Sequence, residues 1–330
     1  MQEFLTAINA QLSSTGVVSF DDSQLLNVEQ SYATVLGGDA FIQVQGIDAA
    51  KFLQGQVTCD MDEVNPAQMR FGAHCTHKGR MIGSFMASKI DSDTYLLKTA
   101  ADNIENLLNS LKKYIVFSKA EASIAKDWIA IGLSGADSES VVSQFFGELP
   151  AGDNQKVIHD NIHCHQISDG QRYEIWLSQS HAQDFWPHCN KLVSASSLNW
   201  QLENIRAGIG QVIADTTEKF IPQAINLHEV GGVSFTKGCY TGQEIVARMK
   251  YLGNQKRHMA HFSATGTSLA AGSNVFMQSS DKNVGEVVNC VTTSNHSCEG
   301  LVVIVDDALS DTIVDDSKQL SLKFTPLSYA

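Results

Sequence analysis

The pattern of apolar residues changes after His258, and this change limits the folds open to the chain. From that point on, short apolar segments are separated by Gly, Ser, Asn and Asp, and no helical spacing interrupts them. The segments are residues 258–264, 274–278, 284–291, 301–305 and 319–324. A run of short strands without intervening helices predicts a small antiparallel sheet or barrel at this end of the chain.

Helical and extended patterns alternate before that point. The predicted helices are residues 1–12, 49–54, 101–113, 138–147, 180–193 and 198–207. The predicted strands are residues 41–45, several within 67–98, and 115–124, 128–133, 157–167 and 172–177. Pro187 is expected to kink or shorten its helix. The β-α-β-β-α order of residues 128–193 is that of a ferredoxin-like lobe.

A chain of 330 residues is too long for one small core, so we expect several domains. The pattern indicates an α+β protein in three parts. Residues 1–125 form an N-terminal α/β lobe, residues 126–255 a second, ferredoxin-like lobe, and residues 256–330 the antiparallel barrel.

The charge balance argues against direct nucleic-acid binding. The formal net charge is −13, from 23 basic and 36 acidic residues, whereas phosphate contacts need concentrated Lys and Arg. Any action on RNA would therefore be indirect, through another protein. The first residues lack the pattern of a signal peptide, and no apolar run has the length of a membrane span. We therefore expect a cytoplasmic protein without membrane contact.

The seven cysteines are odd in number and widely spaced, without a C-x-x-C pair. This favours reduced thiols over a disulfide framework or a self-contained zinc or iron–sulfur site. His163 and His165 share one face of a predicted strand, as two metal ligands would, but the sequence assigns no third ligand. We expect both to be strand-surface histidines and predict no metal site.

Residues 237–244 read Lys-Gly-Cys-Tyr-Thr-Gly-Gln-Glu and form the strongest motif of the chain. Thr241 and Glu244 are spaced as a capping box, and apolar residues follow at helical spacing. Cys239 would lie two residues before the helix N-cap, where N–H groups favour an anion, and Lys237 adds a cation. Position alone leaves two interpretations open: a nucleophilic thiol, or a buried cysteine beside a capped helix. The local excess of basic residues around Arg248 fits either a solvated loop or a subsite for an anionic small molecule.

This motif resembles the signature of the YgfZ family, a group of folate-binding, tRNA-modifying proteins related to the glycine cleavage T-protein. Residues 46–58, 73–80, 112–119 and 220–227 also resemble segments of that family, so the resemblance covers most of the chain. It implies two α/β lobes and a C-terminal barrel around a central folate pocket. The implied cofactor is tetrahydrofolate or a derivative. The residues expected to bind it are Trp200, Tyr240, Gln243, Glu244, Arg248, Arg206 and Phe41. Trp200 matches a family tryptophan associated with folate, although its place in a helix also fits a core residue. Phe41 lies where a second family tryptophan has no counterpart.

The resemblance implies a folate-binding protein that supports the assembly or repair of iron–sulfur enzymes and the modification of some tRNAs, with a link to replication control. The implied protein partners are iron–sulfur enzymes such as those that thiomethylate tRNA. We expect Cys239, with Lys237, to supply a reactive thiol. The alternative is a folate-dependent aminomethyl or methyl transferase. Residues 78–84 lack the carboxylate of the T-protein catalytic site, which argues against aminomethyl transfer. Arg206 matches a glutamate that contacts the pterin in relatives, so the resemblance does not fix the pose of the pterin.

Overall fold

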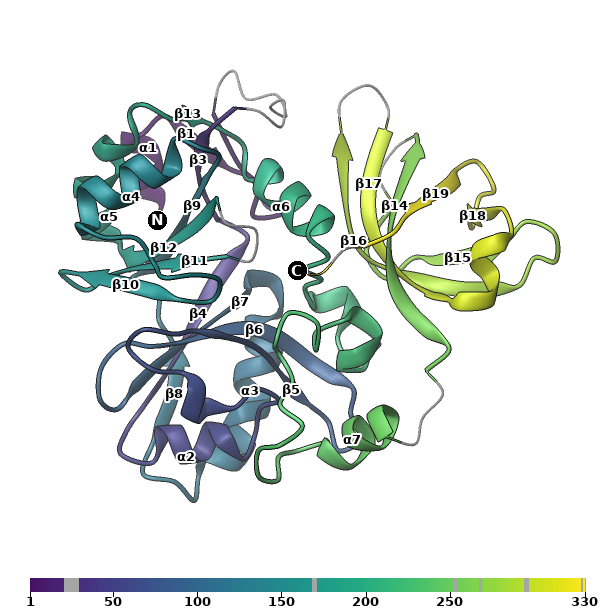
Figure 1. Cartoon of the computed structure of the whole chain (residues 1–330), viewed down its shortest axis with the longest axis horizontal. Coiled ribbons are helices and arrows are strands. Elements are labelled where there is room, and N and C mark those ends of the chain that lie inside the picture. The colour runs from purple at the N-terminus through teal and green to yellow at the C-terminus, as the bar shows by residue number, and fades with distance from the viewer. Residues whose placement is uncertain are drawn as a thin grey trace.

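Two sheets and a barrel meet around the middle of the molecule (Figure 1). This computed structural model describes residues 1–20, 30–167, 171–251, 255–266, 269–293, 297–327 and 329. The two sheets lie one above the other on the left of Figure 1, the barrel lies on the right, and the C-terminus reaches the space where the three meet. The predicted combination of two ferredoxin-like lobes and a C-terminal barrel is confirmed.

The lower sheet is antiparallel and has the order β5-β6-β7-β4-β8. Its strands are β4 (Asp39–Gln45), β5 (Arg70–Cys75), β6 (Met81–Lys89), β7 (Thr94–Ala100) and β8 (Glu121–Ile124). Along β4, Ile42 and Val44 pack in the cluster that contains residues of helices α2 (Ala49–Gln54) and α3 (Ile104–Ile115), whereas Phe41 packs in the cluster shared with the second sheet. This alternation is the period of two expected of a strand buried on both faces. Because α3 continues through Ile115, the strand predicted for residues 115–124 is wrong in its first half.

The upper sheet has the order β10-β11-β12-β9-β3-β13. Its strands are β3 (Tyr32–Val35), β9 (Trp128–Ser134), β10 (Lys156–His159), β11 (Ile162–Gln166), β12 (Arg172–Ser178) and β13 (Val193–Ser194). Helices α1 (Gln2–Ala7), α4 (Ser138–Phe146) and α5 (Gln179–Phe185) pack on one of its faces. Since β3 pairs with β9, a boundary at residue 125 cuts across this sheet. The three-part division of the chain by residue number stays a prediction.

Two helix predictions need correction at their ends. The helix predicted for residues 1–12 stops at Ala7, because Asn9 has a φ of 56° and β1 (Ala10–Leu12) then pairs with β2 (Val18–Phe20). The helix predicted for residues 180–193 stops at Phe185 and continues as a 3₁₀ turn, Trp186–Cys189. Pro187 lies in that turn, and the predicted shortening is confirmed.

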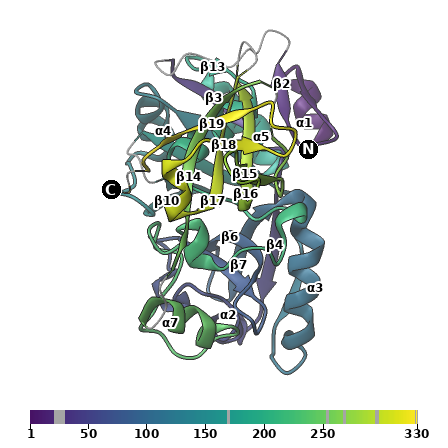
Figure 2. The same ribbon diagram turned by 90° about the vertical axis from the view of Figure 1, so that its right-hand side faces the viewer.

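The third part is a closed barrel with the order β14-β17-β16-β15-β18-β19, and β14 also pairs with β19. Its strands are β14 (Arg257–Thr265), β15 (Asn274–Met277), β16 (Asn283–Thr293), β17 (Ser297–Val305), β18 (Ile313–Asp315) and β19 (Ser321–Thr325). Buried side chains such as Phe262, Val302 and Ile304 fill its interior. Each described strand of the barrel pairs on both sides, which suits a run of short strands. Figure 2 shows the barrel from the side opposite the two sheets.

Two helices connect these parts. Helix α6 (Ser197–Arg206) lies between the upper sheet and the barrel and contacts β16 and β17 (Figure 1). Helix α7 (Gln243–Tyr251) lies beside the lower lobe, before the barrel begins. In the part of the chain that the structure describes, no helix is long and apolar enough to cross a membrane.

Candidate functional site

A central cavity lies where the two sheets meet α6. Its space, together with the open solvent at its mouth, amounts to about 910 Å³. Apolar side chains from both lobes form much of its wall, among them Phe71, Met86 and Ile167. Residues 208–211, which follow α6, and Ile225, Leu227 and Val230 complete the wall.

A buried ion cluster forms one wall of this cavity. Lys98 on β7 places its Nζ 2.6 Å from Asp39 Oδ2 and 3.0 Å from Glu174 Oε1. Asp39 also accepts a 3.0 Å hydrogen bond from Gln211 Nε2, and Glu174 accepts one from Trp176 Nε1. The cluster therefore joins the lower sheet, the upper sheet and the segment after α6.

Burial and mutual charge set the protonation of this cluster. Burial raises the pKa of Glu174, and the charge of Asp39 adds to this rise, whereas Lys98 opposes it. Burial lowers the pKa of Lys98, but the two carboxylates outweigh burial and leave that pKa above its usual value. Lys98 is therefore held as a cation between two acids. None of these residues was predicted from the sequence. The available signal was a charged residue beside large apolar residues within a strand, at Lys98 after Leu96 and Leu97 and at Glu174 before Ile175 and Trp176.

Trp200 lies on α6, whose N-terminus is capped by the Ser196 hydroxyl. The indole is 2% exposed, lines the cavity and packs on β9 at Gly132, where a Cβ would lie 2.6 Å from the ring. The Arg172 guanidinium lies 4.1 Å from the ring centroid. The indole Nε1 of Trp200 has no hydrogen-bond partner among the described residues. Trp200 is thus both a core residue and part of the cavity wall.

The motif of residues 237–244 lies elsewhere, against the lower lobe. Lys237 is buried, and its Nζ donates to the carbonyl oxygens of Val57 and Cys59 at 2.9 and 2.7 Å. The same Nζ lies 5.1 Å from the centroid of the buried Tyr240 ring. Burial lowers the pKa of Lys237 to about 8 and raises that of Tyr240. Cys239, between them, is exposed, so the interpretation as a buried cysteine is wrong.

The predicted capping box at Thr241 and Glu244 is wrong. The Thr241 N–H donates to Gly55 O at 3.2 Å and its hydroxyl to Gln56 Oε1 at 3.2 Å, so neither serves the helix. Helix α7 begins at Gln243 instead. Gly242 precedes it with a φ of +86°, in a place where a Cβ would lie 2.6 Å from Thr76 O. Contacts with the lower lobe, which no local pattern reveals, decide the start of α7.

Comparisons with known proteins identify the family. Residues 40–198 match the model of the GCVT N-terminal domain. The tRNA-modifying protein YgfZ of Yersinia enterocolitica is 31% identical over 301 residues, which cover 88% of this chain and 90% of that protein. The chain belongs to the YgfZ family. The tRNA-modifying protein YgfZ of Photorhabdus laumondii is 33% identical over 297 residues, covering 88% and 89% of the two chains.

A solved structure shows the same fold. The glycine cleavage system aminomethyltransferase T of Bartonella henselae superposes with a TM-score of 0.78 at 13% identity, covering 99% of this chain and 96% of the other. The expected T-protein-like architecture is therefore confirmed for this YgfZ-family chain.

The remaining expected site residues of this YgfZ-family chain lie outside the cavity wall. Phe41 is 1% exposed and packs edge-on against Trp176 with 5.1 Å between ring centroids. Arg206 pairs with Glu299 of the barrel, with Nη2 2.6 Å from Oε1. Gln243 is half-buried on α7, where Glu244 and Arg248 are exposed. Of the expected cofactor-binding set, Trp200 lines the cavity, and the other six residues do not.

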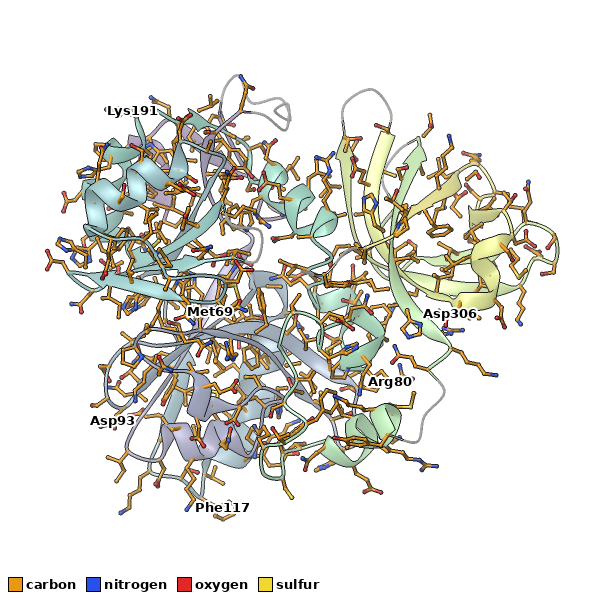
Figure 3. The ribbon with its side chains drawn as sticks, viewed as in Figure 1. Met69, Arg80, Asp93, Phe117, Lys191 and Asp306 are labelled. Carbon is orange, nitrogen blue, oxygen red and sulfur yellow. The ribbon has the colours of Figure 1, made fainter. Side chains whose placement is uncertain are left out.

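The histidines of β11 are not on the surface. His163 and His165 are 1% and 0% exposed, and Lys156 Nζ lies 3.5 Å from His163 Nδ1 and 2.7 Å from Ser88 Oγ. Burial lowers the pKa of Lys156 to about 7 and that of His163 to about 3. The backbone of this region joins the two sheets, because Lys156 N donates to Ala67 O and Met69 N donates to Asn154 O; Figure 3 labels Met69 between the two sheets. Within the described ranges, no group of three or more His, Cys, Asp or Glu side chains could hold a metal ion.

Proposed function

We propose that this YgfZ-family chain binds tetrahydrofolate, or a derivative, in the central cavity and thereby supports the modification of tRNA through iron–sulfur enzymes. The observation that carries the proposal is a cavity at the junction of the two lobes, with the buried Trp200 and its unpaired indole N–H in the wall. The similarity to relatives called tRNA-modifying proteins supports the role in tRNA modification. A cytoplasmic location and the link to replication control belong to the same proposal.

The residues of the cavity fit a pterin, a flat ring system with several hydrogen-bonding edges. Trp200 offers an indole N–H that is buried and without a partner among the described residues, a donor that a ligand acceptor would satisfy. Asp39 and Glu174 are acceptors for ring N–H groups, and Lys98 holds both in place. When bound, a folate supplies one-carbon or redox chemistry. These side chains would bind it, orient it and exclude water.

The exposed thiol of Cys239 is the second element of the proposal. Cys239 belongs to a loop that is held by hydrogen bonds on both sides. Before it, Lys237 Nζ donates to the carbonyl oxygens of Val57 and Cys59; after it, Thr241 N donates to Gly55 O. Lys237 therefore acts as a positioning residue for this loop. We propose that Cys239 reacts with, or contacts, a protein partner at the surface. In cells that lack the chain, a Cys239→Ala copy should fail to restore methylthiolated tRNA nucleosides, as measured by mass spectrometry. Full restoration would refute the role of the thiol.

Binding of folate is tested by thermal unfolding with tetrahydrofolate. A ligand at 100 times its Kd stabilises the native state by about 2.7 kcal/mol, which should raise the Tm by several degrees. Trp200→Phe keeps an aromatic ring in the core but removes the N–H, and should lose much of this shift. Trp186→Phe is the matched control, because Trp186 packs on Phe20 in the upper lobe and lies outside the cavity wall. Equal shifts in both variants, or none in the unmodified chain, would refute the assignment.

A folate-dependent aminomethyl or methyl transferase is the second candidate. The observation in its favour is that two carboxylates, Asp39 and Glu174, line the cavity although residues 78–84 have none. Against it, both carboxylates are already paired with Lys98. Turnover of an aminomethyl donor by the purified chain with tetrahydrofolate, lost in Glu174→Gln, would favour the transferase.

A further inference from the structure

Three large apolar side chains project into solvent at the end of the lower lobe. Ile47 is 69% exposed, Val116 is 68% exposed and Phe117 is 95% exposed. Figure 3 shows Phe117 at the far lower end of the molecule, directed away from it. Exposed apolar residues are common singly, but a group on one edge marks a contact surface.

The backbone holds these side chains outside. The loop of Ile47 and the loop of Phe117 are joined by two hydrogen bonds, from Lys119 N to Asp48 Oδ2 at 2.8 Å and from Asp48 N to Lys119 O at 3.4 Å. Gly46 approaches so closely that a Cβ there would lie 2.3 Å from Lys119 O. Because the loops are fixed to each other, exposure of the apolar groups is part of the native structure.

A hollow lies beside these side chains. Phe52, Tyr114 and Phe117 contribute to its wall, and it encloses about 540 Å³, counted out to open solvent. Gly55 and Gln56 also line it, and these two residues accept the hydrogen bonds of Thr241. The hollow is therefore continuous with the loop that carries the exposed Cys239.

Four exposed lysines lie on the segments that carry the hollow and the apolar group. Lys51 lines the hollow, Lys112 and Lys113 occupy the last turn of α3, and Lys119 follows Phe117 and Ser118; all four are exposed. Asp48 also lines the hollow, and its carboxylate accepts the Lys119 N–H. With exposed Asp93, whose carbonyl accepts the Gly46 N–H, and exposed Glu121 included, the four lysines outnumber the three acids by one, on a chain with a net charge of −13.

We propose that this region is a docking surface for a protein segment that carries an aromatic or aliphatic anchor flanked by carboxylates. We call it the tip surface and define it by Ile47, Lys51, Lys112, Lys113, Val116 and Phe117. The anchor fills the hollow and packs on Phe117, while its acidic neighbours meet the lysines. A partner docked here lies against the Cys239 loop. The surface stands on its own geometry and does not depend on folate in the cavity.

Charge and shape favour a short acidic protein segment over other anionic partners. At physiological salt the electrostatic attraction of the lysines is screened beyond about 8 Å, so it favours a segment short enough to stay on the tip surface. A nucleic acid or an anionic bilayer extends beyond it and meets the acidic remainder of the chain. Two of the three exposed apolar residues are aliphatic and offer no stacking platform for bases. The hollow beside Phe117 has room for a single anchoring side chain, which a protein segment supplies.

A random 12-residue peptide library displayed on phage, selected on the full chain, tests this proposal. The enriched peptides should carry an aromatic residue or Leu between Asp or Glu residues, and synthetic copies should bind more weakly as salt increases. Phe117→Ser should weaken that binding at least tenfold, and Lys112→Glu with Lys113→Glu should weaken it and remove its salt dependence. Leu309→Ser is the matched control, because Leu309 is a 43% exposed apolar residue of the barrel, and should change binding less than twofold.

Three results would overturn the proposal. The first is that no peptide is enriched, or that the enriched peptides lack acidic residues. The second is that they bind the Phe117→Ser variant as well as the unmodified chain. The third is that a 12-nucleotide single-stranded RNA or a phosphatidylglycerol vesicle binds in a manner lost with Phe117→Ser. The thermal shift with tetrahydrofolate should persist in Phe117→Ser, which separates this surface from the cavity.

Discussion

Replacement of Lys98 by Met tests whether the ion cluster stabilises the junction of the two lobes. The variant keeps an unbranched side chain, one atom shorter than that of lysine, but leaves Asp39 and Glu174 buried without their cation. Removing one partner of a buried ion pair costs about 3–5 kcal/mol. At about 2 °C per kcal/mol for a chain of this size, Lys98→Met should lower the Tm by roughly 6–10 °C.

The pH dependence of this loss identifies its cause. Lys98 holds down the pKa of Glu174, which burial raises. In the variant that pKa rises further, so the native state takes up a proton that the unfolded chain releases. A group whose pKa is raised in the native state stabilises it at low pH and loses that contribution as pH rises. The difference in unfolding free energy between Lys98→Met and the unmodified chain should therefore be smaller at pH 5.5 than at pH 8.

Urea unfolding at both pH values measures this difference. Lys126→Met is the matched control, since Lys126 is exposed in a turn, and should change the free energy by less than about 0.5 kcal/mol. Adding Glu174→Gln to Lys98→Met should recover part of the loss, because one buried charge is removed. A loss in Lys98→Met that is independent of pH, and unchanged by Glu174→Gln, would show that packing and not charge explains it.

Three further predictions concern the lobe interface, the thiols and the cavity wall. The free energy of unfolding should rise between pH 7 and pH 9.5. The pKa of buried Lys156 is about 7, whereas unfolded lysine stays protonated to about 10.4, so the unfolded chain binds more protons over this range. In urea titrations, Lys156→Met should reduce this rise by up to about 1.4 kcal/mol per pH unit. A maleimide at pH 7.5 should label the exposed Cys239 of the native chain rapidly. It should label Cys290 slowly, because burial raises the pKa of that thiol to about 12. Mass spectrometry should show that Cys239→Ala lacks the fast product. Gly132→Ala should lower stability by about 1–3 kcal/mol and reduce the tetrahydrofolate shift, because the new methyl group overlaps Trp200; an unchanged Tm and shift would contradict that packing.

Local sequence patterns account for much of the fold. The switch to short strands after His258 corresponds to the barrel, and the alternation before it to two ferredoxin-like lobes. The pattern could not assign β3 to the upper sheet, because a four-residue strand does not specify its partner. Nor could it find the ion cluster, since Asp39, Lys98 and Glu174 are far apart in sequence. Asp39 and Lys98 lie on paired strands of the lower sheet, and Glu174 meets them where the upper sheet packs on it. At Thr241 the local pattern predicted a capping box that the structure does not form, because the Thr241 N–H and hydroxyl donate to Gly55 and Gln56 of the lower lobe instead.

The packing of the 237–244 motif separates its structural residues from those with another role. Lys237 binds backbone carbonyls, Tyr240 is buried beside it, and Gly242 has a positive φ against Thr76. These contacts explain why such residues are needed there. Gly238 and Cys239 are exposed, and a Cβ at Gly238 would meet nothing within 4 Å. The fold therefore does not require glycine at position 238. Gly238→Ala should keep the Tm within about 1 °C, and if it nevertheless impairs tRNA modification, the open space before Cys239 is needed by a partner and not by the fold.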